Sequence, residues 1–139
     1  MIIQIIGLPG SGKTTLAKAL KNKINAIHLN ADEVRNFVNY DLGFTHADRL
    51  THSRRLSGMS RLLSEQGYNI VVDFICPTKE TRTAFGVPDV LVWVDRIKSG
   101  RYDDTNLLWE DPSHVDVTIS HGMSIEEEVN VVLEFIEKL

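Results

Sequence analysis

The sequence predicts a three-layer α/β fold, in which a five-stranded parallel sheet is flanked by helices. Short apolar runs alternate along the chain with segments whose apolar residues recur every three or four positions. This alternation is typical of β-α-β units. The apolar runs are nearly continuous, as expected of strands buried on both faces of a sheet. A length of 139 residues fits one domain, residues 1–139, with a sizeable core.

The first half of the chain contains five predicted elements. In order, they are a strand at 2–6, a helix at about 13–23, a strand at 26–29, a short helix at 31–37 and a long helix at 47–66. In the long helix, leucines recur at helical spacing, and Gly67 follows its end.

The second half continues the alternation. Its predicted elements are a strand at 70–72, a helix that begins within 77–80, a strand at 90–94, a strand at 115–119 and a last helix that follows Ser124. Residues 95–114 are polar and irregular. Ser124 and Glu127 match a capping box, which favours a helix start at this position.

Composition excludes several functional classes. The net charge of −4 argues against an extended surface for nucleic acid or anionic membranes. No apolar run approaches the roughly 18 residues of a membrane span. The one cysteine, Cys76, excludes an internal disulfide and fits a reducing compartment. We therefore expect a cytoplasmic protein without a membrane or nucleic-acid partner.

The segment Gly7–Thr14 matches the phosphate-binding pattern G-x-x-x-x-G-K-[ST]. It lies between a predicted strand and a predicted helix, which is the context that phosphate binding requires. Lys13 can reach the β- and γ-phosphates of ATP, and the Thr14 hydroxyl can ligate Mg²⁺. The residues predicted to bind the nucleotide are Gly7, Leu8, Pro9, Gly10, Ser11, Gly12, Lys13, Thr14 and Thr15. The chain is thus predicted to be a P-loop NTPase that uses ATP and Mg²⁺.

Asp32 and Arg35 follow the second predicted strand. They are three positions apart and share one face of a short helix. A kinase needs a carboxylate near the acceptor hydroxyl and a cation for an anionic substrate, and this pair supplies both. The alternative is an ordinary surface ion pair.

A wider set of residues resembles the adenylylsulfate kinase family, which transfers the γ-phosphate of ATP to the 3′-hydroxyl of adenosine 5′-phosphosulfate. The resemblance covers about residues 2–85 and resumes weakly at 109–112. The matching residues are Asp41-Leu42-Gly43-Phe44, Ala47-Asp48-Arg49, Arg54-Arg55, Phe74-Ile75-Cys76-Pro77 and Arg82.

The resemblance implies a substrate site. By position, Asp32, Arg35 and Arg49 contact the phosphosulfate, and Phe44 stacks on its adenine. Ile75 lies in the backbone turn of that pocket. Physical chemistry agrees, since an anion favours guanidinium groups and a purine favours an aromatic face.

The chain also differs from the family. His52 stands where the family has a substrate-binding Asn, and Cys76 stands for a Ser in the pocket turn. Asn30 replaces the first acid of an Asp-Gly-Asp motif. The segment equivalent to the family's mobile lid, about 95–112, is shortened, and Tyr102 occupies the position of a stacking Phe.

Other polar residues receive simpler interpretations. Asp73 ends the third strand, where it is either a magnesium-associated acid or a structural residue. His28, His46, His114 and His121 lack metal-ligand spacing and are interpreted as structural or solvated. The acids 126–128 are expected in a solvated first helical turn, and Phe85 and Trp93 in the core.

The prediction is therefore a phosphotransferase with a small-molecule acceptor, an adenylylsulfate kinase with a shortened lid. The predicted catalytic residues are Lys13, Asp32 and Asp73, with Thr14 as metal ligand. The predicted substrate-binding residues are Asp32, Arg35, Phe44, Arg49, His52, Ile75, Cys76 and Tyr102. The alternatives are a kinase for another hydroxyl, such as a nucleotide or a polynucleotide 5′-end, and a nucleotide-binding module with reduced catalysis. A homodimer is compatible with the sequence.

Overall fold

The computed structural model describes residues 1–97 and 108–139. The described residues contain a five-stranded parallel sheet with the order β2-β3-β1-β4-β5. The strands are β1 (Ile2–Ile6), β2 (Ile27–Asn30), β3 (Ile70–Asp73), β4 (Val90–Asp95) and β5 (Val117–Ser120). The predicted α/β fold with five parallel strands is confirmed.

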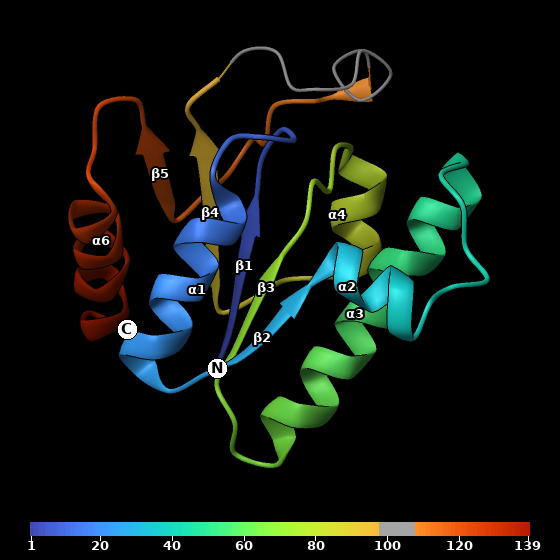
Figure 1. The fold of residues 1–139 in the computed structure, drawn as a ribbon, viewed down its shortest axis with the longest axis horizontal. Helices are drawn as coiled ribbons and strands as arrows, with labels where there is room; N and C mark the ends of the chain where they lie inside the picture. The colour runs from blue at the N-terminus through green and yellow to red at the C-terminus, as the bar shows by residue number, and fades with distance from the viewer. Residues whose placement is uncertain (98–107) are drawn as a thin grey trace.

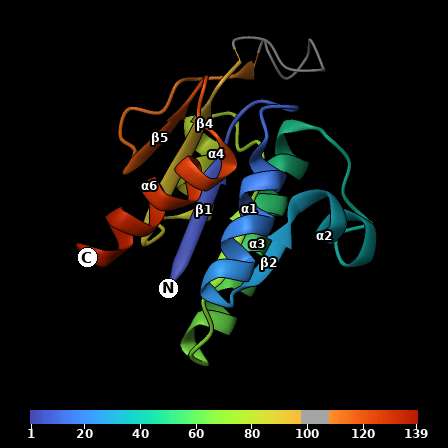
Figure 2. The ribbon, with the colours of Figure 1, turned by 60° about the vertical axis from the view of Figure 1, so that its left-hand side comes forward.

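Helices cover both faces of the sheet (Figure 1). They are α1 (Lys13–Ile24), α2 (Ala31–Phe37), α3 (His46–Glu65), α4 (Lys79–Phe85) and α6 (Ile125–Glu137). In the turned view, α1 and α6 lie in front of the sheet, and α3 and α4 lie behind it (Figure 2). No described helix is long and apolar enough to cross a bilayer.

The side chains of β1 pack into two hydrophobic clusters, one on each face of the sheet. Successive side chains of a strand point to opposite faces of the sheet. Ile3 and Ile5 accordingly pack in the cluster that α1 and α6 cover. Ile2 and Ile6 pack in the second cluster, with residues of α2, α3 and α4. The two faces of one short apolar strand therefore hold the three layers together.

Most element boundaries lie within one residue of the prediction, and the informative exception is the strand predicted at 115–119, which begins two residues later. The carboxylate of Asp116 accepts a hydrogen bond from Leu91 N at 2.8 Å, and Asp116 N donates to Leu91 O at 3.0 Å. The Asp116 carboxylate thus takes the place of a backbone carbonyl in the hydrogen-bond ladder between β4 and β5. For this reason β5 begins only at Val117.

The start of α6 combines a confirmed prediction with a wrong one. The capping box of Ser124 and Glu127 is present. Glu128, however, is 1% exposed rather than solvated, because it lies on the same face of the helix as Val132. Its carboxylate forms an ion pair with Arg96, the residue that follows β4.

The predicted core aromatics differ in burial. Phe85 is fully buried and packs against Phe74 with ring centroids 5.5 Å apart. Trp93 is only half-buried and stacks on Trp109, with centroids 6.3 Å apart. The C-terminal part of the chain therefore returns across this sheet face.

All five strands run in the same direction, so their carboxyl ends meet at one edge of the sheet (Figure 1). The segment Gly7–Gly12 leaves β1 there, α2 follows β2, and the turn 74–78 follows β3. Ligands of open α/β sheets bind at this edge.

Candidate active site

The phosphate loop requires glycine at two positions. Gly7 has φ +157°, and a Cβ there would lie 2.8 Å from the carbonyl oxygen of Val94. Gly12 has φ +101°, and a Cβ there would lie 2.9 Å from Nη1 of Arg96. Both positions therefore combine an unusual backbone conformation with a close neighbour. The tight curl leads directly into α1, whose N-terminus favours an anion.

Lys13 begins α1 and curls back over the loop. Its Nζ donates a hydrogen bond to the carbonyl of Leu8 at 2.9 Å, and the residue is 8% exposed. The ammonium group thus lies at the loop that is predicted to hold the phosphates. A lysine in this position supplies positive charge to a transferring phosphoryl group.

Three polar residues meet beside the first turn of α1. Thr14 Oγ1 donates to Oδ1 of Asp73 at 3.0 Å, and Asn30 Nδ2 donates to the same oxygen at 3.1 Å. Asn30 and Asp73 end the neighbouring strands β2 and β3 and are register partners. The hydroxyl and carboxylate oxygens of this cluster are donors of the kind that Mg²⁺ prefers. These residues fit the predicted metal.

The other oxygen of this carboxylate has a partner that sequence reasoning missed. His28 Nε2 bonds to Oδ2 of Asp73. His28 is expected from the sequence to be structural or solvated, and this bond gives it a structural contact with a residue of the predicted site. The alternation of side chains along a strand could have indicated this contact, because His28 and Asn30 point to the same face of β2.

A pocket of about 780 Å³ joins the phosphate loop to the predicted substrate residues. The predicted residues that line it are Pro9, Gly10, Gly12, Lys13, Thr14, Thr15, Asp32, Arg35, Phe44, Arg49, His52, Asp73, Ile75 and Cys76. Its further lining residues are Asn30, Ala31, Ser53, Phe74, Pro77 and Thr81. Side chains from α2, α3 and the β3–α4 turn thus meet the loop at one cavity.

A few predicted residues do not line this pocket. Gly7, Leu8 and Ser11 are buried in the loop itself, where they shape it rather than face the cavity. Contact of a nucleotide with their backbone N–H groups stays a prediction. Tyr102 lies outside the described residues.

Two guanidinium groups surround Phe44 at the far end of the pocket. Cζ of Arg35 lies 4.3 Å and Cζ of Arg49 lies 5.8 Å from the ring centroid. Burial and the charge of Arg49 lower the pKa of Arg35, while Asp32 and Asp48 raise it. Two cations held close together favour an anionic ligand, and the exposed ring offers an aromatic surface.

Hydrogen bonds determine which nitrogen of His52 carries the proton. Arg55 Nη1 donates to Asn39 Oδ1 at 3.2 Å, so the Asn39 amide directs its nitrogen to His52 Nδ1 at 2.9 Å. Nδ1 must accept, and Nε2 carries the proton. Burial and the positive charge of Arg35 lower the pKa of His52 to about 4. The imidazole is therefore neutral near pH 7 and has a donor at Nε2.

Cys76 lies in the pocket turn with φ +48° and is buried. Burial raises the pKa of its thiol to about 12, while hydrogen bonding to Thr81 acts in the opposite direction. The sulfur is therefore a neutral thiol near pH 7. A neutral thiol is a poor nucleophile, and the site has no activated cysteine at this position.

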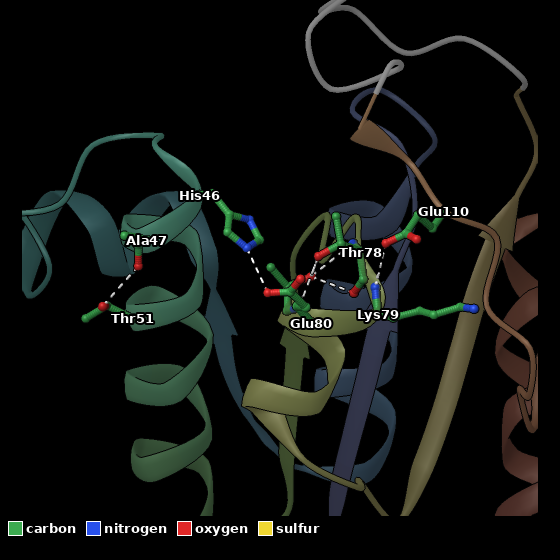
Figure 3. Close-up of polar contacts among 8 residues, drawn as sticks. His46, Ala47, Thr51, Thr78, Lys79, Glu80 and Glu110 are labelled. Atoms are coloured by element: carbon green, nitrogen blue, oxygen red, sulfur yellow. Dashed lines mark hydrogen bonds and ion pairs between the residues drawn. The ribbon is translucent and has the colours of Figure 1, made fainter.

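Contacts from two distant segments hold the pocket turn (Figure 3). Glu110 Oε1 accepts from Lys79 N at 3.0 Å, and Glu110 N donates to the Pro77 carbonyl at 2.7 Å. On the other side, His46 Nε2 lies 2.9 Å from Oε2 of Glu80. The backbone that presents the pocket turn is thus tied to both α3 and residue 110.

The comparisons with known proteins agree with this arrangement. A family model described as adenylylsulphate kinase matches residues 1–87. The adenylyl-sulfate kinase of Bacillus licheniformis is 41% identical over 86 residues, which cover 58% of this chain and 44% of that protein. The one of Burkholderia ambifaria is 34% identical over 87 residues, which cover 59% and 48%. The chain spans less than half the length of these curated relatives.

A solved structure shows the same similarity across the whole fold. The APS kinase CysC of Mycobacterium tuberculosis, in complex with AMPPNP and APS, has a TM-score of 0.85 and 25% identity. The match covers 98% of this chain and 96% of that one. The family match extends over more than half of the sequence and includes the phosphate loop and the pocket residues up to Cys76. The chain belongs to the adenylylsulphate kinase family.

Proposed function

We propose that this protein transfers the γ-phosphoryl group of ATP to the 3′-hydroxyl of adenosine 5′-phosphosulfate. The observation that carries the proposal is that one pocket joins Lys13 and Thr14 to Arg35, Phe44 and Arg49. One end is suited to a triphosphate, and the other to an anionic purine nucleotide. The CysC structure, described as a complex with AMPPNP and APS, supports this choice of ligands.

The proposed reaction is a direct transfer. Asp32 lines the pocket beside Arg35 and accepts the proton of the 3′-hydroxyl. The hydroxyl oxygen forms a bond to the γ-phosphorus as the bond to the β–γ bridging oxygen breaks, and ADP leaves. Lys13 and the loop amides stabilise the charge that develops on the phosphoryl oxygens.

Magnesium would be held by the Thr14 hydroxyl with the carboxylate of Asp73 nearby, and it would neutralise phosphate charge. Arg35 and Arg49 grip the phosphosulfate, and Phe44 positions the purine. The neutral thiol of Cys76 takes no covalent part. Positioning and electrostatics therefore carry the chemistry.

An acceptor panel tests the proposal. ADP release is measured with adenosine 5′-phosphosulfate, with nucleosides and nucleotides, and with an oligonucleotide that has a 5′-hydroxyl. We expect the highest kcat/KM for adenosine 5′-phosphosulfate, with the 3′-phosphorylated product identified by mass. Faster turnover of another acceptor would assign a different kinase activity. Nucleotide binding without any turnover would assign a binding module. The Lys13→Ala variant, purified in parallel, controls for contaminating kinases.

A further inference from the structure

Three side chains form hydrogen bonds with the buried carboxylate of Asp73. Its side chain is 2% exposed, and that of His28 is 10% exposed. Oδ2 bonds to His28 Nε2, whereas Oδ1 accepts from Thr14 and Asn30. A buried carboxylate must recover the hydrogen bonds that it loses with water, and here every bond comes from a neighbouring strand or from α1.

The division of the two oxygens gives the carboxylate a direction. Thr14, Asn30 and Asp73 line the pocket, whereas His28 does not. The oxygen on the pocket side is Oδ1, which meets the Thr14 hydroxyl at 3.0 Å. His28 therefore holds the carboxylate from behind, through Oδ2. Rotation of the carboxylate would break bonds on both sides.

The position of His28 in the sheet makes this contact possible. His28 and Asn30 are two residues apart in β2, so both side chains leave the same face of the strand. The parallel register places Asn30 beside Asp73 and His28 beside Val71. His28 lies two residues before Asn30, the register partner of Asp73, and its imidazole is long enough to reach the Asp73 carboxylate from there.

We infer that His28 is a positioning residue for metal binding: it orients Asp73 so that Oδ1 serves the metal ion of the metal–nucleotide complex beside Thr14. This inference rests on one part of the proposed function, namely that the pocket binds a metal–nucleotide complex. It does not depend on which acceptor is phosphorylated. Groups behind a metal-binding side chain set its orientation, and their loss typically weakens metal affinity by about 10- to 100-fold.

The test compares binding of ADP with and without metal. Mn²⁺ serves as the paramagnetic probe, and its affinity for the protein–ADP complex is measured by electron paramagnetic resonance. ADP affinity in EDTA is measured by calorimetry. We expect His28→Leu to weaken Mn²⁺ binding by about tenfold or more and to leave metal-free ADP binding within about twofold. His28→Gln, which keeps an N–H donor, should recover most of the Mn²⁺ affinity.

Matched variants separate positioning from folding. Asp73→Asn should weaken Mn²⁺ binding at least as much as His28→Leu, and His114→Gln, at an exposed histidine, should change nothing. Circular dichroism checks the fold. If His28→Leu does not fold, His28→Asn replaces it, because the shorter amide does not reach Asp73.

Two results would overturn the inference. One is unchanged Mn²⁺ affinity in a folded His28 variant, and the other is an equal loss of metal-free ADP binding, which would indicate a general structural role. Neither measurement contains an acceptor. A failed acceptor panel with an intact Mn²⁺ effect therefore overturns the proposed function alone, and turnover of adenosine 5′-phosphosulfate without a Mn²⁺ effect overturns this inference alone.

Discussion

The two ends of the pocket are built in different ways. At the phosphate end, the loop Gly7–Gly12 and the first turn of α1 come from one continuous segment, and we expect backbone groups to do most of the binding. At the proposed acceptor end, α2 contributes Arg35, the segment before α3 contributes Phe44, and α3 contributes Arg49. The first end depends on local backbone shape, and the second on tertiary packing.

This difference has a consequence for specificity. Backbone amides recognise any phosphate chain, whereas the acceptor end depends on a few side chains at defined distances. Changes at the phosphate end should therefore affect turnover with every acceptor. Changes at the acceptor end should affect one substrate and leave ATP nearly unaffected.

The largest effect is expected for Lys13→Ala. Loss of the ammonium group should lower kcat by about 100-fold or more, because its charge stabilises the transferring phosphoryl group. Single-turnover kinetics measure this directly. Lys18→Ala, on the exposed face of the same helix, is the control. Near-normal turnover in folded Lys13→Ala protein would contradict the kinase assignment.

Removal of a guanidinium group at the other end should act on the acceptor. We expect Arg35→Ala and Arg49→Ala each to cost about 1.5–3 kcal/mol of acceptor binding, the usual value of a hydrogen bond to a charged group. Initial-rate kinetics should show a raised KM for the acceptor and an unchanged KM for ATP. Arg54→Ala, an exposed arginine of α3, should leave both values unchanged. A selective loss of ATP binding would mean that the two ends are assigned the wrong way round.

Phe44→Ala should weaken the same substrate by about 1–3 kcal/mol through lost stacking. The ring also contacts the Arg35 guanidinium, so Phe44→Leu is a useful second variant that keeps bulk without an aromatic face. Acceptor binding is measured by calorimetry. The control is Phe37→Ala, which changes an 81% exposed ring outside the pocket. Equal losses for Phe37 and Phe44 would argue against stacking.

His52 should make stability depend on pH. Its pKa is lowered from 6.5 to about 4 in the folded protein, mainly by burial. Between these values the unfolded chain binds the proton and the folded protein does not, so the free energy of unfolding falls as the pH is lowered. Its contribution is complete above pH 6.5. Urea denaturation at several pH values should show a shallower pH dependence in His52→Asn than in the unchanged protein. Identical slopes would contradict the lowered pKa.

The smallest effect is expected at Cys76. A neutral, buried thiol forms no phosphorylated intermediate, so Cys76→Ser and Cys76→Ala should both keep substantial activity. Stability should change more than chemistry, since the side chain is packed in the second core cluster. Steady-state kinetics and thermal unfolding separate the two. Loss of kcat in the alanine variant alone would require a hydroxyl or thiol in the reaction.

Some features were predictable because they depend on nearby residues. The phosphate loop, the Ser124 capping box and the five strands each follow from short-range spacing, and all are present in the structure. Backbone conformation is decided within a few residues, so a local pattern carries enough information. The sequence by itself therefore determined the fold class and the position of the phosphate site.

Other features became visible only in three dimensions. The contact of His28 with Asp73 requires the register of β2 on β3. The proton position on His52 follows from Asn39 and Arg55, 13 and 3 residues away along the chain. These contacts depend on which strands become neighbours and which helix faces turn inward. No local pattern specifies either, because both are set by packing of the whole domain.

Glu128 is the clearest case in which a local sequence pattern does not specify burial. Three consecutive acids at a helix start indicate a solvated turn, yet the third is buried against Arg96. Only the packing of α6 on the sheet decides which of the three faces inward, and the cost of burying that carboxylate is offset by a cation from the end of β4. The sequence determined that α6 begins with acids, and the tertiary structure decided that one of them lies beside Arg96, whose guanidinium occupies the space next to Gly12 of the phosphate loop.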